Sequence, residues 1–166
     1  MPRFEHLRHK PPTPLEQPRP LTIVLAPMRS NINLSRIVRL CGCAGIPRII
    51  QCGAGKVDRE VARDAVDVVE IVVRRSLVPV LEQLGRDGIF RIGLEQTTNS
   101  QSLFEYSFPK NTALVIGSER EGHNQSELDL LDAVIEIPVF GKPYSYNVAT
   151  ATTMAVYEYC RQYPKG

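Results

Sequence analysis

The sequence of 166 residues lacks any apolar run near the roughly 20 residues that a membrane-spanning helix requires. Its first residues also lack the apolar core of a secretory signal. Cysteine is scarce, at positions 41, 43, 52 and 160 only, and the paired spacing of a zinc site is missing. We therefore expect a cytoplasmic protein without a membrane or a metal, whose thiols are small buried side chains rather than disulfides or ligands.

The glycine signatures of common nucleotide sites are missing too. The first apolar run, residues 21–26, leads into residues 27–31 with neither G-x-G-x-x-G nor G-x-x-x-x-G-K-[ST]. An ordinary Rossmann dinucleotide site or a P-loop is therefore disfavoured. Any nucleotide-like cofactor has to be held by loops further along the chain.

Excess charge of either sign is small. The net charge of +2 does not by itself indicate a nucleic-acid partner. Residues 1–20 differ from the rest, because they combine several basic side chains with six of the 13 prolines. This composition predicts an extended arm, in which Arg8 and Lys10 are candidates for binding an RNA phosphate backbone. A poorly ordered tail is the alternative.

Apolar β-rich runs alternate with helical patterns along the remaining chain. Strands are predicted at 21–26, 48–52, 68–73, 90–94, 113–116 and 133–137, and helices at 33–44, 58–67, 77–85, 125–131 and 147–162. The first helix is expected to have Asn33 as its N-cap and Gly45 at its end, with an apolar face and an arginine face. Such alternation indicates a single α/β domain with a parallel sheet and helices on both faces.

Two loops in the last third of the chain carry the strongest chemical signal. The run G-S-E-R-E-G begins at Gly117, directly after a predicted strand, and Ser145-Tyr146-Asn147 opens a helix of small residues. A glycine after a strand lets a flat ligand approach the main chain, although this run alone is equally typical of a turn. Together the two loops predict a cofactor site.

These motifs resemble the SpoU (TrmH-like) branch of the SPOUT RNA methyltransferases, which move a methyl group from S-adenosyl-L-methionine to a ribose 2′-hydroxyl. The resemblance covers about residues 21–162, with motifs at 33–41, 114–139 and 145–159. It implies that the C-terminal segment of the α/β sheet forms a deep trefoil knot. It also implies a homodimer through the first and last helices, and a division into a basic, proline-rich arm, 1–20, and a methyltransferase domain, 21–166.

The resemblance also implies roles for individual residues. Those carried over to cofactor binding are Leu94, Glu95, Gln96, Gly117, Ile137, Ser145 and Tyr146. Those carried over to catalysis are Arg39, Asn33, Glu119, Ser145 and Asn147. For Arg39 we favour stabilising a phosphate or a developing alkoxide over acting as a base, because a guanidinium holds its proton tightly. Arg36 beside it is a candidate for RNA binding or a plain solvated side chain.

Within this family, the segments 93–100 and 119–122 look most like those of enzymes that methylate the D-loop guanosine of tRNA, position 18. That nucleotide is the first candidate substrate. Another tRNA position, rRNA and a non-catalytic RNA-binding module of the same fold are the alternatives. One departure is Tyr146, which stands where leucine is usual in the family.

Overall fold

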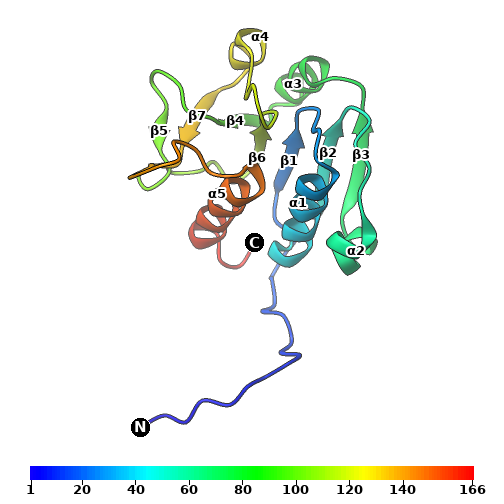
Figure 1. The fold of residues 1–166 in the computed structure, drawn as a ribbon, viewed down its shortest axis with the longest axis vertical. Helices are drawn as coiled ribbons and strands as arrows, with labels where there is room; N and C mark the ends of the chain where they lie inside the picture. Colours follow the sequence, from blue (N-terminus) through cyan, green and yellow to red (C-terminus); the bar gives the residue numbers. More distant parts are fainter.

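The computed structural model describes residues 1–166, and Figure 1 shows one sheet with helices packed against it. Its strands, all paired in parallel, follow the order β3-β2-β1-β6-β4-β7-β5. They are β1 (Leu21–Leu25), β2 (Arg48–Cys52), β3 (Glu70–Arg74), β4 (Phe90–Leu94), β5 (Gln101–Ser102), β6 (Thr112–Ile116) and β7 (Ala133–Glu136). The predicted parallel α/β sheet is confirmed.

The helices cover both faces of this sheet. They are α1 (Asn31–Ala44), α2 (Arg59–Ala62) with the 3-10 turn η1 (Arg63–Asp67), α3 (Leu77–Arg86), α4 (Gln125–Leu128) and α5 (Val148–Gln162). The core has two parts, one on each face of the sheet, and β1 contributes to both because successive strand side chains point to opposite faces. Ile23 packs with α1 and α5, whereas Val24 packs with α3. None of the helices combines the length and apolar character needed to cross a bilayer.

The N-cap of helix α1 lies three residues earlier than its sequence pattern suggested. Its N-cap is Ser30, whose Oγ accepts a hydrogen bond from the Asn33 backbone N–H at 3.1 Å. The prediction of Asn33 as N-cap is therefore wrong. Gly45 ends the helix in the left-handed conformation, with φ of 69°, as expected. The apolar face is buried, and Arg36 and Arg39 are exposed.

Other boundaries shift by a few residues. The strand expected from residue 68 begins at Glu70, the helix expected to reach residue 131 ends at Leu128, and β5 was not expected at all. The prediction of four buried thiols is wrong for Cys43, which is exposed on the arginine face of α1. Burial raises the pKa of Cys41 to about 12, so this thiol is inert.

The N-terminal residues fall into two parts. Residues 1–14 are exposed and extend away from the sheet, and this stretch contains Arg8 and Lys10 (Figure 1). Residues nearer the sheet are anchored: the Glu16 backbone N–H donates to the Lys165 carbonyl at 2.9 Å. Arg19 is buried, and its guanidinium donates to the carbonyls of Ala44, at 2.7 Å, and of Tyr163. This arginine therefore serves the fold.

Candidate functional site

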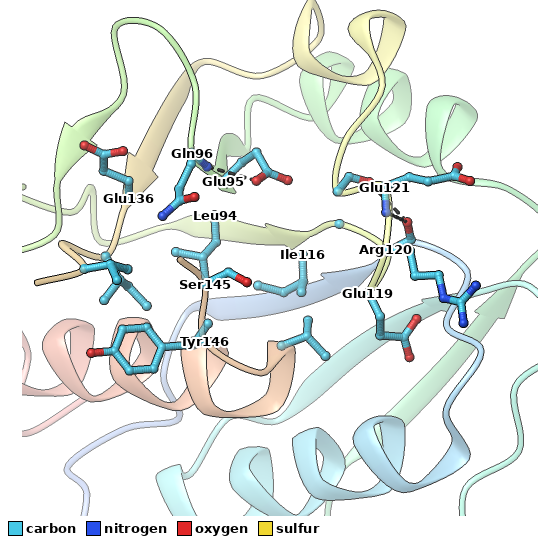
Figure 2. Close-up of a pocket in the computed structure, with 17 residues that line it drawn as sticks. Leu94, Glu95, Gln96, Ile116, Glu119, Arg120, Glu121, Glu136, Ser145 and Tyr146 are labelled. Carbon is cyan, nitrogen blue, oxygen red and sulfur yellow. Dashed lines mark hydrogen bonds between the residues drawn. The ribbon is translucent and has the colours of Figure 1, made fainter. Parts of the chain in front are cut away.

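A cavity of about 270 Å³ opens where β4, β6 and β7 end. Parallel strands bring their carboxyl ends to one edge of the sheet, where ligands of α/β proteins commonly bind. Figure 2 shows Glu136 and Gln96 on one side of the cavity and Glu119 and Arg120 on the other. The residues that the resemblance assigns to the cofactor all line it: Leu94, Glu95, Gln96, Gly117, Ile137, Ser145 and Tyr146.

Two glycines shape the loop between β6 and α4. A Cβ added to Gly117 would lie 2.6 Å from the carbonyl carbon of Gly122, and Ser118 pairs with Gly122 in an isolated antiparallel bridge. Gly122 has a φ of 63°, and a Cβ there would overlap the carboxylate of Glu95. Only glycine accommodates both the left-handed backbone and this close approach. The main chain therefore forms this wall of the cavity.

Glu95 fastens that loop to the end of β4. Its carboxylate accepts hydrogen bonds from the Gln96 backbone N–H at 2.9 Å and from the His123 backbone N–H at 3.2 Å. Gln96 in turn donates through Nε2 to the carbonyl of Tyr144 at 3.2 Å. These contacts join loops that lie far apart in the sequence, so the cavity is held open by polar bonds between its own walls.

The charged side chains that line the cavity are mostly acidic. Four residues with carboxylates, Glu95, Glu119, Glu121 and Glu136, line it together with one cationic residue, Arg120. Opposite charges attract across a few ångströms even near a protein surface, and like charges repel. The lining therefore favours a cationic ligand over a polyphosphate.

Glu119 links the cavity to the start of α1. Its carboxylate accepts hydrogen bonds from the backbone N–H groups of Arg29, at 3.1 Å, and Ser30, at 2.9 Å. Partial burial raises the pKa of Glu119, but the hydrogen bonds from Ser30, Arg29 and the Asn33 side chain outweigh it and lower the pKa below its usual value. The carboxylate is therefore ionised at neutral pH.

Asn33 and Asn147 meet beside this carboxylate. Asn147 Nδ2 donates to Asn33 Oδ1 at 3.3 Å, and Asn147 Oδ1 accepts from the Ala149 backbone N–H at 2.9 Å as N-cap of α5. This cap agrees with the sequence, in which Ser145-Tyr146-Asn147 opens the last helix. The structure thus gathers Glu119, Asn33 and Asn147 at the junction of two helix starts, next to Ser145 on the cavity wall.

The predicted basic residues lie elsewhere. Arg39 follows Asn33 by six residues on α1, about 9 Å along the helix axis, and does not line the cavity. Arg36 is exposed on the same helix, and Arg8 and Lys10 belong to the extended residues 1–14. Within one chain, these four basic residues are not brought to the cofactor loops.

Several lining residues were not singled out from the sequence. They are Ile116, Ser118, Arg120, Glu121, Gly122, Glu136, Val139, Val148 and Ala151. The run that begins at Gly117 already contained a signal for four of them. Val148 and Ala151 lie on the first turn of α5, where helical spacing after Asn147 could have identified them.

The fold and the cavity define a class of protein: a parallel α/β domain whose carboxyl-edge loops, without a glycine-rich phosphate motif, surround an acidic ligand cavity. The SpoU rRNA Methylase family model matches residues 20–157. The chain belongs to this family, which confirms the resemblance found in its motifs.

The relatives of known name include enzymes that act on tRNA and enzymes that act on rRNA. The chain is 32% identical to the Mus musculus tRNA (guanosine(18)-2′-O)-methyltransferase TARBP1 over 148 residues, 86% of this chain and 9% of that protein. It is 28% identical to the Ralstonia nicotianae 23S rRNA (guanosine-2′-O-)-methyltransferase RlmB, over 86% of this chain and 59% of that one. The chain therefore spans less than two thirds of the length of either relative.

A solved structure agrees with the fold. The crystal structure of the A. aeolicus TrmH/SpoU tRNA modifying enzyme superimposes with a TM-score of 0.82 at 25% sequence identity. The match covers 88% of this chain and 76% of that chain.

Proposed function

We propose that the protein is an S-adenosyl-L-methionine-dependent RNA methyltransferase that modifies a ribose 2′-hydroxyl, with guanosine 18 of tRNA as the first candidate. The observation that carries this proposal is the acidic cavity, which gathers the seven positions that SpoU motifs assign to the cofactor. Membership of the SpoU family supports the reaction class. Relatives named for rRNA make an rRNA nucleotide the second candidate.

The lining fits this cofactor better than it fits a phosphorylated nucleotide. S-adenosyl-L-methionine carries a sulfonium and an ammonium group against one carboxylate, so its net charge is positive, and it supplies an electrophilic methyl group when bound. The carboxylates of Glu95, Glu119 and Glu136 favour those positive charges and would repel phosphates. Leu94 and Ile137 provide apolar contact, and the main chain at Gly117 lies close enough for a planar base.

The remaining groups would hold and polarise the ribose. We assign Glu119, Asn33 and Asn147 to orienting the nucleotide, because ordered side chains near the reacting atoms reduce the entropic barrier. Arg39 would stabilise the negative charge that develops on the ribose oxygen, or the adjacent phosphate. Because Arg39 does not line the cavity of its own chain, we assign this role to the Arg39 of a second protomer.

A homodimer through α1 and α5 meets that requirement. The two helices pack against each other on one face of the sheet (Figure 1). Ile32 on α1 and Tyr157 on α5 are 43% and 56% exposed, large apolar side chains suited to an interface. In the proposed dimer, Arg39 of each protomer reaches the cofactor cavity of the other, and Arg36 lies nearby to bind phosphate.

We also propose that the C-terminal segment is threaded as a deep trefoil knot. Supporting contacts lie at both ends of the 95–111 segment. Gln96 bonds to the Tyr144 carbonyl near its start, and Tyr159 Oη donates to the Lys110 carbonyl at 2.6 Å near its end. A chain that contacts this long loop at both ends, before and within α5, is in position to pass through it.

The remaining proposals concern context. The residues 1–20 form an RNA-binding arm in which Arg8 and Lys10 contact phosphates, and residues 21–166 form the methyltransferase domain. A reducing cytoplasmic location suits the free thiols, including the exposed Cys43.

The test is methyl transfer from labelled S-adenosyl-L-methionine to total tRNA and to rRNA, followed by nucleoside mass mapping. We expect 2′-O-methylguanosine at tRNA position 18. Arg39→Ala should bind the cofactor as wild type does, since Arg39 lies outside the cavity of its own chain, and should lose transfer. Arg86→Ala, an exposed arginine at the end of α3, is the matched control. Undiminished turnover by Arg39→Ala would refute the catalytic role of Arg39. Absence of methyl transfer from the wild type to any RNA would refute the assignment as a methyltransferase.

A further inference from the structure

Basic side chains follow four neighbouring strands at regular positions. Lys56, Arg29 and Arg120 each come four residues after the last residue of β2, β1 and β6, and β3 ends at Arg74 with Arg75 next. These strands are consecutive in the sheet, in the order β3-β2-β1-β6. The parallel topology therefore places Arg74, Arg75, Lys56, Arg29 and Arg120, here called the basic track, along one edge.

The loops that carry the basic track contact one another. The Gly53 backbone N–H donates to the Arg74 carbonyl at 2.9 Å, and a Cβ added to Gly53 would lie 2.9 Å from Pro27 Cβ. The Arg29 backbone N–H donates to Glu119 Oε2 at 3.1 Å, beside Arg120. These contacts connect the loops from β3 to β6 across the edge, which makes the track a continuous surface.

The cations of the basic track are exposed, and none takes part in an ion pair. The opposite edge of the sheet differs. There Arg48 pairs with Glu70 at 3.5 Å, and Arg91 pairs with Asp132 at 2.8 Å, in each case across neighbouring strands. Arg48 and Arg91 at the amino edge are thus neutralised within the fold, whereas the unpaired cations of the basic track are available to an external anion.

The spacing of the basic track suits a polynucleotide. Neighbouring strands lie about 4.8 Å apart, so β3 to β6 spans about 14 Å. A nucleic-acid strand carries one phosphate per about 3.4 Å of its axis, so about four phosphates match this length. A row of unpaired cations on four neighbouring strands fits a regular polyanion better than the irregular charges of an acidic protein.

The basic track ends beside the cofactor cavity. A second hollow of about 330 Å³ is lined by the cations Arg29 and Arg120, by Asn124, and by the carboxylates of Glu119, Glu121 and Glu127, and it shares residues 118–122 with the cavity. The edge therefore turns acidic from this hollow onward, and Glu95 and Glu136 continue the acidic part at the ends of β4 and β7. Phosphates would be attracted to the part of the edge at β3, β2 and β1 and repelled from the part beyond it.

We propose that the basic track binds the phosphate backbone of the substrate RNA and leads the target nucleotide into the hollow beside the cofactor cavity. This proposal rests on the proposed function. It adds a binding surface distinct from residues 1–20, Arg36 and Arg39, and it fixes the side from which RNA reaches the cavity.

The test compares two triple variants of the full chain that lose equal charge. R29Q/K56Q/R74Q removes three track cations and spares Arg120, which lines the cofactor cavity. R48Q/R59Q/R86Q removes three exposed cations near the amino edge as the control. Fluorescence anisotropy with a fluorescein-labelled tRNA transcript, over a series of KCl concentrations, gives the affinity and its salt slope. Thermal melts check folding, and R74Q alone gives a milder variant.

The track variant should bind the transcript at least about tenfold more weakly, with a log–log salt slope reduced by about two, near 0.7 per lost phosphate contact. The control should match wild type. An unchanged slope in the track variant, or equal losses in both variants, would overturn the proposal. Displacement of the tRNA by polyglutamate as readily as by unlabelled RNA would overturn it in favour of an acidic protein.

Calorimetry with S-adenosyl-L-methionine separates this proposal from the one on which it rests. If the wild type binds the cofactor and methylates RNA, and the track variant binds RNA as tightly as the wild type does, only the role of the basic track is refuted. If the wild type binds RNA through the track but neither binds the cofactor nor transfers a methyl group, only the proposed function is refuted.

Discussion

Replacing Gly122 by alanine should damage the cofactor cavity more than it damages the fold. The residue has a φ of 63°, where a side chain costs about 1–2 kcal/mol in backbone strain. The new Cβ would also overlap the carboxylate of Glu95, whose flexible side chain has to move away. That movement breaks the bond to the His123 backbone, 3.2 Å long, for about another 1 kcal/mol. The sum is roughly 2–3 kcal/mol.

Gly88 provides the matched control for this substitution. Its φ is 71°, nearly that of Gly122, but a Cβ added there has no neighbour within 4 Å. Gly88→Ala should therefore show the backbone cost alone, about 1–2 kcal/mol. The difference between the two variants isolates the displacement of Glu95.

Urea unfolding measures both costs, and calorimetry with S-adenosyl-L-methionine measures the consequence for the site. We expect Gly122→Ala to bind the cofactor at least about tenfold more weakly, because Glu95 and the 118–122 loop both line the cavity. Gly88→Ala should bind it as wild type does. Equal stability and equal cofactor affinity in the two variants would refute the reasoning that the loop is held by the contact between Gly122 and Glu95.

Three further substitutions test how the site is attached to the fold. Glu119→Gln should lower stability by about 1–2 kcal/mol at pH 7. The folded-state pKa of Glu119 is lowered, so its ionised form stabilises the fold at pH values above the usual carboxyl pKa. This contribution is lost as pH falls through the folded pKa. The free energy of unfolding should therefore fall less on acidification in the variant than in the wild type. Asn147→Ala removes the N-cap of α5 and should cost about 1 kcal/mol in urea, whereas Thr150→Ala, one turn further on, should cost less. Arg19→Ala should lower thermal stability by about 2–3 kcal/mol through two unsatisfied carbonyls, and equal melting of variant and wild type would contradict the anchoring of residues 15–20.

Strands that carry several large apolar side chains were predictable from the sequence, and a strand formed only through its pairing was not. Residues 90–94 form β4 as predicted, since their side chains carry the β pattern. Val68 was placed in a strand because it is apolar, but its backbone N–H bonds to the Ala65 carbonyl at the end of η1, and β3 begins two residues later. Strand β5 has the polar sequence Gln-Ser and exists only through its pairing with β7. Tertiary contacts override local preference at such places.

The start of α1 shows the same limit at the site. Ser30 and Asn33 are both good N-cap residues, so local sequence cannot choose between them. The choice is made by Glu119, 89 positions away from Ser30, whose carboxylate accepts the Ser30 backbone N–H. The motif positions identified the loops that line the cavity, but the bond between this carboxylate and the first helix emerges only in three dimensions.

Calorimetric titration of the purified protein with S-adenosyl-L-methionine, alongside ATP, tests the central claim most directly. The acidic cavity at the ends of β4, β6 and β7 should bind the cationic cofactor with micromolar affinity and should not bind the polyphosphate. The account is contradicted if millimolar S-adenosyl-L-methionine gives no binding heat, or if ATP binds as tightly.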